Sequence, residues 1–400
     1  MVNSIQETKG KQPLDNNWPW WPLFPLYPYG KKHTLFRELI PNQVWSFEQL
    51  QGLYYVAVPI RLTVVKVDGG LMLVNPLPPT KELLRDLSLI EEKHGPVLTI
   101  VLPTASGLEH KISLPALARA FPNAKLWVCP GQWSFPLNVS LDFIGIPSNR
   151  TYTLSEDGFP HQEDCSWFSL GPLNIGLGRF QEFSCFHKAS NSLLVTDALV
   201  SIDPSPPELF NFDPLPLLFH ARDRGDQLLE DTPEKRRKGW LRLVLFASFL
   251  RPQNLNIPPI KDILRRAFKP GLRNLKAHFG LFPFSWQDGW EESAELLIGK
   301  KQPHIQIAPV IQRLVFPRSR DSYLMWLEEI YSLKRITWLI SAHYSAPIRF
   351  TTRQIKDLQK RIINEPWVPE EGNWAFLNSV DQSLLKTGIV PNKPLDHFKD

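Results

Sequence analysis

Chemically versatile side chains gather in three short segments of this chain of 400 residues. The segment of residues 104–110, Thr-Ala-Ser-Gly-Leu-Glu-His, ends in a carboxylate and an imidazole, at Glu109 and His110. Two later segments end at Asp197, after Leu-Leu-Val-Thr, and at His343, after Ser-Ala. Carboxylates and imidazoles are groups that proteins use for acid–base catalysis and for holding metal ions. The fold must decide whether the three segments meet.

The elements around the first segment predict a layered α/β fold. Residues 56–67 and 71–75 are rich in β-formers and flank an Asp-Gly-Gly turn, so a β-hairpin is expected. Leucines at helical spacing predict a helix over residues 81–94, which Gly95-Pro96 ends. A strand at residues 97–102, a helix at 114–120 and a strand at 125–129 are expected next. In such sheets ligands bind in the loops after the strands, which is where residues 104–110 fall.

The rest of the chain alternates between β-rich and helical parts. Residues 203–217 are rich in proline and separate a β-rich part from a mostly helical segment at about 233–300. Residues 365–400 have no periodic pattern and are expected to form an irregular tail. Strands are predicted at residues 167–170, 173–177, 180–186, 192–197 and 337–340, and helices at residues 320–333 and 351–364.

The sequence of residues 1–30 predicts no helix or strand in the N-terminal part of the chain. Residues 1–17 are polar and expected to be disordered. In residues 18–30 prolines alternate with aromatic and aliphatic side chains, which forbids a helix or a central strand and favours an extended path. Such a strap either wraps the domain and buries its rings or offers an apolar surface to a membrane or a protein partner.

Composition indicates a globular protein with one large α/β domain and insertions, or with two domains. Hydrophobic residues make up 43% of the chain, and its net charge of +5 is too mild to indicate nucleic-acid binding. Basic residues cluster, however, at positions 235–238, at Arg265, Arg266 and Lys269, and at Arg273 and Lys276. These clusters form either a solvated helical face or a surface for anionic lipid, phosphate or an acidic partner.

Cysteine usage and hydropathy indicate a soluble, cytoplasmic protein. Cys129, Cys165 and Cys185 are odd in number and fit neither a disulfide framework nor a CxxC metal motif, so we expect a reducing compartment. The N-terminus lacks the pattern of a signal peptide, and no run of 18 apolar residues occurs. Peripheral contact with a membrane stays open as an expectation.

The chain resembles the metallo-β-lactamase superfamily in the order of its elements. This order is a hairpin, Asn75-Pro76, a helix, a strand, the histidine loop, a strand followed by Thr-Asp, and a strand followed by Ala-His. The chain resembles more closely an uncharacterised family of cyanobacterial and plant proteins, a domain of unknown function thought to share that fold. The resemblance implies an α/β fold of the αββα sandwich type, with the helical segment as an insertion, and the Pro/aromatic-rich strap precedes it. The expected divisions are residues 1–43 for the start and strap, 44–202 and 319–364 for the sandwich, 203–318 for the insertion, and 365–400 for the tail.

The resemblance also implies the metal ligands. The superfamily motif Thr-His-x-His-x-Asp-His has Ala105 and Gly107 at its first two histidine positions here, and no histidine occurs near residues 178–179, where a third is expected. One of the two metal sites of the superfamily therefore lacks its ligands. The ligands of the other site match Glu109, His110, Asp197 and His343. This set suits one zinc, iron or manganese ion, with Asp197 as a ligand or general base.

Two functions are compatible with these residues. The first is a hydrolase of unknown substrate with a degenerate, at most mononuclear, metal site. The second is a non-catalytic binding or scaffold protein that docks on a partner or an anionic membrane; its ligand loop persists without metal, with Glu109 paired to Arg179 or His110. The remaining histidines indicate less. His187 is expected at the surface and His161 in a solvated loop, while His220 and His278 are expected in the core or on the surface of the insertion.

Overall fold

The computed structural model describes residues 26–28, 30–132, 140–175, 179–267, 269–272, 280–299, 304–333, 335–366 and 369–391. Most of the predicted strap, as well as Arg273, Lys276 and His278, lies outside the described residues. Within them, β1 (Leu26–Tyr27) pairs with β3 and Tyr27 is buried, so the described end of the strap packs against the domain.

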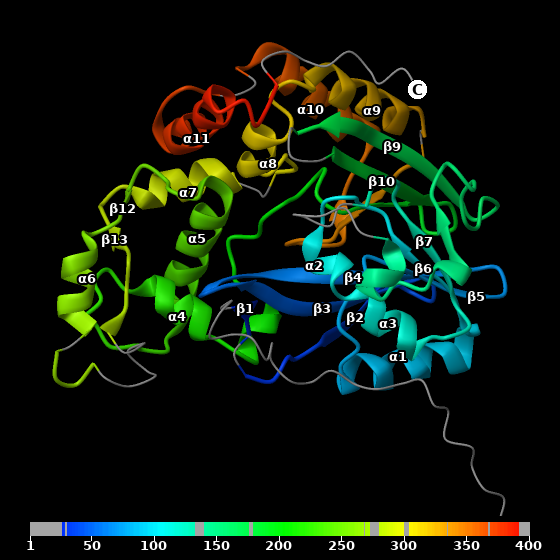
Figure 1. The fold of residues 1–400 in the computed structure, drawn as a ribbon, viewed down its shortest axis with the longest axis horizontal. Helices are drawn as coiled ribbons and strands as arrows, with labels where there is room; N and C mark the ends of the chain where they lie inside the picture. The colour runs from blue at the N-terminus through cyan, green and yellow to red at the C-terminus, as the bar shows by residue number, and fades with distance from the viewer. Residues whose placement is uncertain are drawn as a thin grey trace, which may run out of the picture.

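Two sheets form the centre of the molecule (Figure 1). The first has eight strands in the order β1-β3-β4-β5-β6-β7-β8, with β2 paired to β3, and the second has five in the order β15-β14-β11-β10-β9. The first sheet contains β2 (Leu35–Ile40), β3 (Val44–Leu53), β4 (Val56–Val67), β5 (Gly70–Val74), β6 (Val97–Leu102), β7 (Lys125–Val128) and β8 (Thr151–Thr153). The second contains β9 (Cys165–Asn174), β10 (Arg179–His187), β11 (Ser192–Val195), β14 (Trp338–Ser341) and β15 (Ile348–Arg349).

Helices cover the outer face of each sheet. Figure 1 shows α1 (Lys81–His94) and α3 (Leu114–Ala120) beside the first sheet, and α9 (Arg320–Ser332) and α10 (Thr352–Asn364) beside the second. Buried side chains form three layers accordingly. Leu87 and Leu117 pack under the first sheet, Val101 and Leu194 meet between the sheets, and Trp326 packs on the second sheet. This layering is an αββα sandwich, which confirms the predicted fold class.

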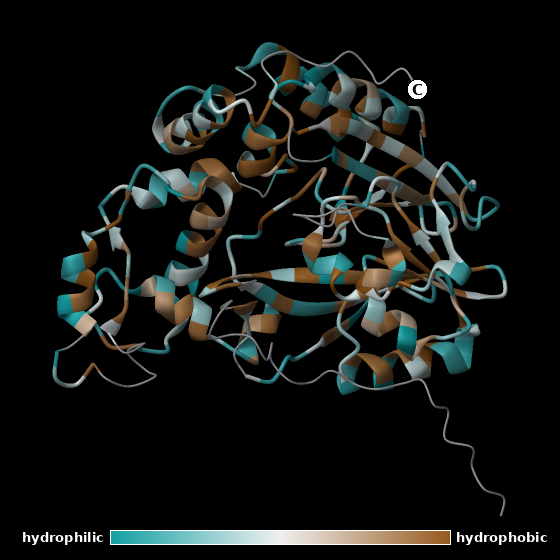
Figure 2. Ribbon diagram, in the orientation of Figure 1, coloured by the Kyte–Doolittle hydropathy of each residue, from teal (hydrophilic) through white to brown (hydrophobic). Residues whose placement is uncertain are grey.

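Between β11 and α9 the chain forms the helical insertion. It contains α4 (Leu215–Ala221), α5 (Pro233–Phe249), α6 (Ile260–Ala267), α7 (Trp290–Ile298) and α8 (Pro309–Leu314), with β12 (Leu255–Asn256) paired to β13 (Ser285–Trp286). Its own core includes Trp240, Phe282 and Trp290, and continues onto the first sheet at Tyr55 and Ala57. Figure 2 shows hydrophobic residues along much of α5, which passes through this core.

Helices with strong local signals have the predicted bounds. The side chain of Thr80 accepts a hydrogen bond from the backbone N–H of Leu83 at the start of α1, and Gly95 ends that helix with a φ of 97°. A positive φ of this kind favours glycine, because a Cβ there is strained. No described helix has both the length and the apolar character needed to cross a membrane.

Four expectations were wrong. The two strands expected at residues 167–170 and 173–177 are one strand, β9, as far as Asn174, because β10 pairs with it on both sides of Gly171-Pro172 with a shift of register there. Residues 176 and 177 lie outside the described residues. Residues 35–40, which were assigned to the start and strap, form β2 of the first sheet. The expected irregular tail contains α11 (Ala375–Lys386), whose Asp381 pairs with Arg313 and Arg318. His187 is fully buried and contacts the Ser190 hydroxyl and the Lys66 carbonyl, both at 2.8 Å. The Lys66 carbonyl lies on a strand that is distant in the sequence, so the neighbours of His187 along the chain did not indicate its burial.

Candidate metal centre

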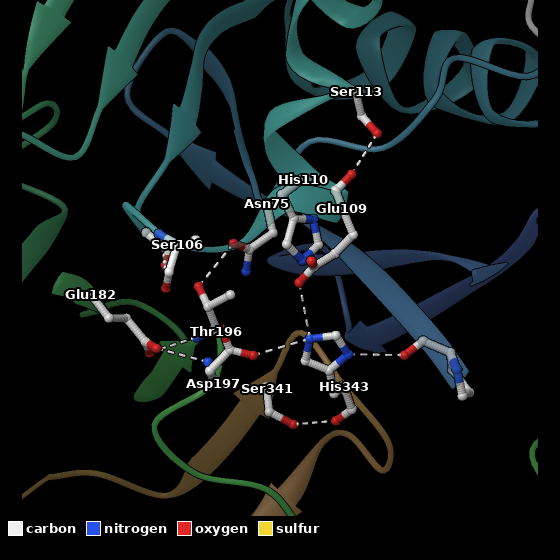
Figure 3. Close-up of polar contacts among 12 residues, drawn as sticks. Asn75, Ser106, Glu109, His110, Ser113, Glu182, Thr196, Asp197, Ser341 and His343 are labelled. Atoms are coloured by element: carbon white, nitrogen blue, oxygen red, sulfur yellow. Dashed lines mark hydrogen bonds and ion pairs between the residues drawn. The ribbon is translucent and has the colours of Figure 1, made fainter. Parts of the chain in front are cut away.

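The three chemically versatile segments meet where strands of both sheets end. Glu109 and His110 lie on α2 (Leu108–Lys111), the short helix after β6. Asp197 follows β11 and His343 follows β14; these two strands are parallel neighbours, so their carboxyl ends lie at one edge of the second sheet. Figure 3 shows the four side chains turned toward one another. The fold therefore brings together every residue of the predicted metal set.

His343 is the centre of the cluster. Its Nε2 lies 3.2 Å from Oδ1 of Asp197 and 3.5 Å from Oε1 of Glu109. One ligand atom from each of Glu109, His110 and His343 lies within 4.8 Å of the others. The carboxylate of Glu109 thus faces His343, and the alternative pairing with Arg179 or His110 was wrong.

Backbone carbonyls orient both imidazoles. Nδ1 of His110 lies 3.1 Å from the Pro76 carbonyl oxygen, and Nδ1 of His343 lies 3.3 Å from the Pro59 carbonyl oxygen. A carbonyl only accepts hydrogen bonds, so each Nδ1 carries a proton and donates it. In the neutral ring the lone pair then resides on Nε2, which is the atom that faces the cluster. Histidine ligands of metals are commonly oriented in this way.

The charges of the cluster are strongly coupled. Burial lowers the pKa of His343, but hydrogen bonds and charge from Asp197 and Glu109 outweigh burial and raise it to about 10. Burial opposes ionisation of Glu109, yet His343 and His110 bring the pKa of this carboxyl down to about 2. Burial lowers the pKa of His110, which favours its neutral form. Without a metal, His343 is therefore an imidazolium between two carboxylates.

The model of a family described as a domain of unknown function, DUF4336, matches residues 41–360, well over half of the chain. This chain belongs to the DUF4336 family. Solved structures similar to it include DIM-1 metallo-β-lactamase exposed to ceftazidime, which is 8% identical with a TM-score of 0.39; the alignment covers 82% of this chain and 97% of that one. The metallo-β-lactamase FIM-1 from Pseudomonas aeruginosa in its mono-zinc form is 9% identical with a TM-score of 0.37, over 84% of this chain and 97% of that one. No curated protein matches the chain.

Glu182 supports the centre of this DUF4336 member and was missed from the sequence. It lies on β10, is buried, and accepts hydrogen bonds from the backbone N–H groups of Thr196, Asp197 and Ala198 at 2.7, 2.7 and 3.0 Å. Burial and the Asp197 carboxylate raise the pKa of Glu182 to about 8. Thr196 also donates its hydroxyl to Asn75 at 2.9 Å. A carboxylate in a β-strand carries no local signal of this role, because its three partners follow a different strand.

We expect Glu182→Gln to loosen the segment that carries Asp197. The amide offers one acceptor oxygen in place of two, so at least one buried backbone N–H loses its partner. The free energy of unfolding should fall by about 1–3 kcal/mol. Chemical denaturation measures this loss, and Glu163→Gln, in an exposed loop, is the matched control. Equal stability of the two variants would show that the three hydrogen bonds contribute nothing.

The other histidines of the described residues lie apart from the centre. His220 is fully buried in the core of the insertion, which is one of the two locations predicted for it. Its Nε2 lies 3.1 Å from the Tyr55 carbonyl oxygen. His161 contacts the Thr99 hydroxyl at 2.8 Å through Nε2, so it is not simply solvated. Among the described residues, one group of three or more possible ligands is close enough for a metal, and it consists of Glu109, His110 and His343. Asp197 joins it through its contact with His343.

Proposed function

We propose that this protein is a metalloprotein that holds one zinc, iron or manganese ion through Glu109, His110, Asp197 and His343, and that the ion serves hydrolysis of a small substrate. The observation that carries the proposal is the convergence of two carbonyl-oriented imidazoles with two carboxylates. Such a donor set suits these metals, which accept imidazole nitrogen and carboxylate oxygen together.

The residues fit a metal ion on two further counts. Nε2 of His110 is buried and has no hydrogen-bond partner, so a lone pair faces the cluster with nothing to accept it. The three other side chains retain exposure of 25% for Glu109, 16% for Asp197 and 13% for His343. The carboxylate side of the cluster is therefore partly open to solvent, while His110 forms its buried side.

An unpartnered histidine nitrogen does not by itself indicate a metal. His220 has the same arrangement, with Nε2 near the Tyr55 carbonyl and a buried Nδ1 without a partner. Burial, with smaller contributions from the charges of Arg242 and Arg222, lowers the pKa of His220 to about 3. The cluster differs because its imidazoles face two carboxylates. The convergence of the four groups, rather than the single unpartnered nitrogen, therefore supports a metal ion.

The geometry around residues 104–110 supports one ion rather than two. A Cβ on Gly107 would lie 2.6 Å from Cγ2 of Thr104, so no larger side chain fits there without movement of that threonine. Ala105 is buried and donates its backbone N–H to the Gln181 carbonyl at 2.9 Å. Neither position offers a ligand atom, which is consistent with a mononuclear centre.

A bound ion would acidify a water molecule and polarise the scissile bond of an ester, amide or phosphate. The chain's own groups hold and orient the reactants. Glu182 fixes the backbone at Asp197, whose carboxylate points into the cluster and can accept a proton as ligand or general base. The carbonyls of Pro59 and Pro76 keep both imidazoles in one tautomer, which leaves Nε2 as the ligand atom.

Elemental analysis of the purified protein tests this function. We expect close to one zinc, iron or manganese ion per chain, and none in the double variant His110→Gln with His343→Gln. His220→Gln is the matched control, because it replaces a carbonyl-bound, buried histidine outside the cluster, and it should retain the metal. A native protein that stays folded without metal and takes up none when it is added would overturn the proposal.

A further inference from the structure

A cavity of about 320 Å³ lies in the helical insertion, away from the residues of the metal centre. It opens between α4, the start of α5 and the connection between them, which Figure 1 places side by side. Small-molecule sites commonly begin near this size. The cavity is lined by Leu218, Ala221, Arg222, Gln227, Leu228, Glu230 and Lys235.

Arg222 is the unusual residue of this cavity. It is only 3% exposed, and its Nε and Nη2 are buried without a hydrogen-bond partner. Its Nη1 reaches the carbonyl oxygens of Gly225 and Gln227 only at 3.5 Å, the limit of a hydrogen bond. Most of the donors of this guanidinium group are therefore unused in a place that water does not reach freely.

No described carboxylate compensates the charge of Arg222. The adjacent Asp223 is bonded to Lys238 at 2.9 Å and to Arg242 at 2.7 Å. The guanidinium carbon instead lies 4.5 Å from the ring centroid of Phe282 and 5.0 Å from that of Phe219. Contacts with aromatic faces offset part of the desolvation of a cation but satisfy none of its planar N–H donors. A group with this geometry matches a carboxylate, which accepts two parallel hydrogen bonds.

We propose that this cavity binds a small organic monocarboxylate, with the carboxylate on Arg222 and an apolar body along Leu218, Ala221 and Leu228. A single buried cation matches a single negative charge. Glu230 and Lys235 also line the cavity, and their opposite charges offset one another, so Arg222 leaves one net positive charge for the ligand. The site is distinct from the metal centre and does not depend on the proposed function.

Calorimetric titration of the full chain with hexanoate and benzoate tests the site. At least one of them should bind, and hexanamide, which has the shape of hexanoate without its charge, should bind about tenfold more weakly or worse. Arg222→Met should weaken carboxylate binding by a similar factor. Arg224→Met is the matched control, because Arg224 is exposed and paired with Asp226, and it should bind as the native chain does. Arg222→Lys keeps a cation but loses the fork, so it should also bind more weakly if Arg222→Met does not fold.

Four outcomes would overturn the proposal. The first is that neither carboxylate binds, and the second is that hexanamide binds as tightly as hexanoate. The third is that the folded variant Arg222→Met or Arg222→Lys binds hexanoate as tightly as the native chain does. Arg222 would then be a structural cation that packs against the rings of Phe219 and Phe282. Inorganic phosphate that displaces hexanoate at equal concentration would exclude the monocarboxylate class.

Discussion

The apparent affinity for zinc should rise about 100-fold between about pH 7 and pH 9, which is about tenfold for each pH unit. The reason is the proton on His343. In the metal-free protein Asp197 and Glu109 raise the pKa of this residue to about 10, so a metal ion must displace that proton from Nε2. A histidine ligand with an ordinary pKa near 6.5 is already deprotonated at pH 7 and would show little change. Glu109, with a pKa near 2, stays ionised throughout and does not compete.

The same proton affects the stability of the metal-free fold with the opposite sign. The pKa of His343 is higher in the folded state than in the unfolded state. Its contribution to stability is therefore complete below about pH 6.5 and is lost as the pH rises from there to about 10. Zinc should consequently stabilise the protein more at pH 9 than at pH 7.

Competition with a chelator of known pH dependence, at three pH values, measures the affinity. His343→Gln serves as the control, because it removes the competing proton together with one ligand; its affinity should be low and nearly independent of pH. An affinity of the native chain that changes by less than about threefold over this range would mean that His343 is neutral in the metal-free protein. The two carboxylates would then be less closely coupled to His343 than their distances indicate.

Arg61→Met should lower the free energy of unfolding by about 3–5 kcal/mol. Arg61 on β4 and Glu48 on β3 are directly opposite in the sheet, both almost fully buried, with Nε of Arg61 3.0 Å from Oε1 of Glu48. Burial opposes ionisation of Glu48, and Arg61 together with Arg37 keeps the pKa of this carboxyl below its usual value. Removing Arg61 leaves a buried carboxylate whose remaining ion pair is with the partly exposed Arg37.

The same arginine holds the segment that carries His343. It donates hydrogen bonds to the carbonyl oxygens of Ser341 and Tyr344, on either side of that histidine. Next to Arg61, Ile60 forms an isolated β-bridge with His343. The Pro59 carbonyl oxygen accepts a hydrogen bond from Nδ1 of His343. Arg61→Met should therefore weaken metal binding as well as stability, because it frees the segment on which one ligand depends.

Urea denaturation compares Arg61→Met with two other variants. The double variant Arg61→Met with Glu48→Met should lose less stability than Arg61→Met alone, because no buried charge is left uncompensated. Arg85→Met is the matched control: its side chain is 69% exposed and pairs with Asp86 at the surface, so its effect should stay within about 0.5 kcal/mol. Arg61→Met and Arg85→Met with equal stabilities would contradict the role given to the buried pair.

Local patterns sufficed where neighbours along the chain determine the conformation. The spacing of Leu83, Leu87 and Ile90, with Thr80 before them and Gly95 after them, predicted α1 with its observed bounds. The residues of the candidate centre were named from the resemblance of three motifs to a known superfamily, and the local pattern placed the loop of residues 104–110 after a strand. Geometry added that Glu109 and Asp197 share His343 as their partner.

Other features depend on residues that meet only in the folded chain. Glu182 has its partners on the segment after β11, and His187 is buried by contact with Lys66, more than a hundred positions away. The orphaned donors of Arg222 follow from packing against Phe282 and from the pairing of Asp223 with two other cations. None of these contacts has a period or a spacing that could be recognised beforehand.

The sequence by itself determined the layered α/β order and the helices with strong caps, because hydrophobic period, capping and turn residues act over a few positions. It also supplied the four candidate ligands, through the resemblance of its motifs to a known superfamily. Only the tertiary structure decided the tautomers of His110 and His343, the support from Glu182 and Arg61, and the empty donors of Arg222. Burial and hydrogen-bond partners, which set charge and orientation, come from strands that are distant in the chain and adjacent in the fold.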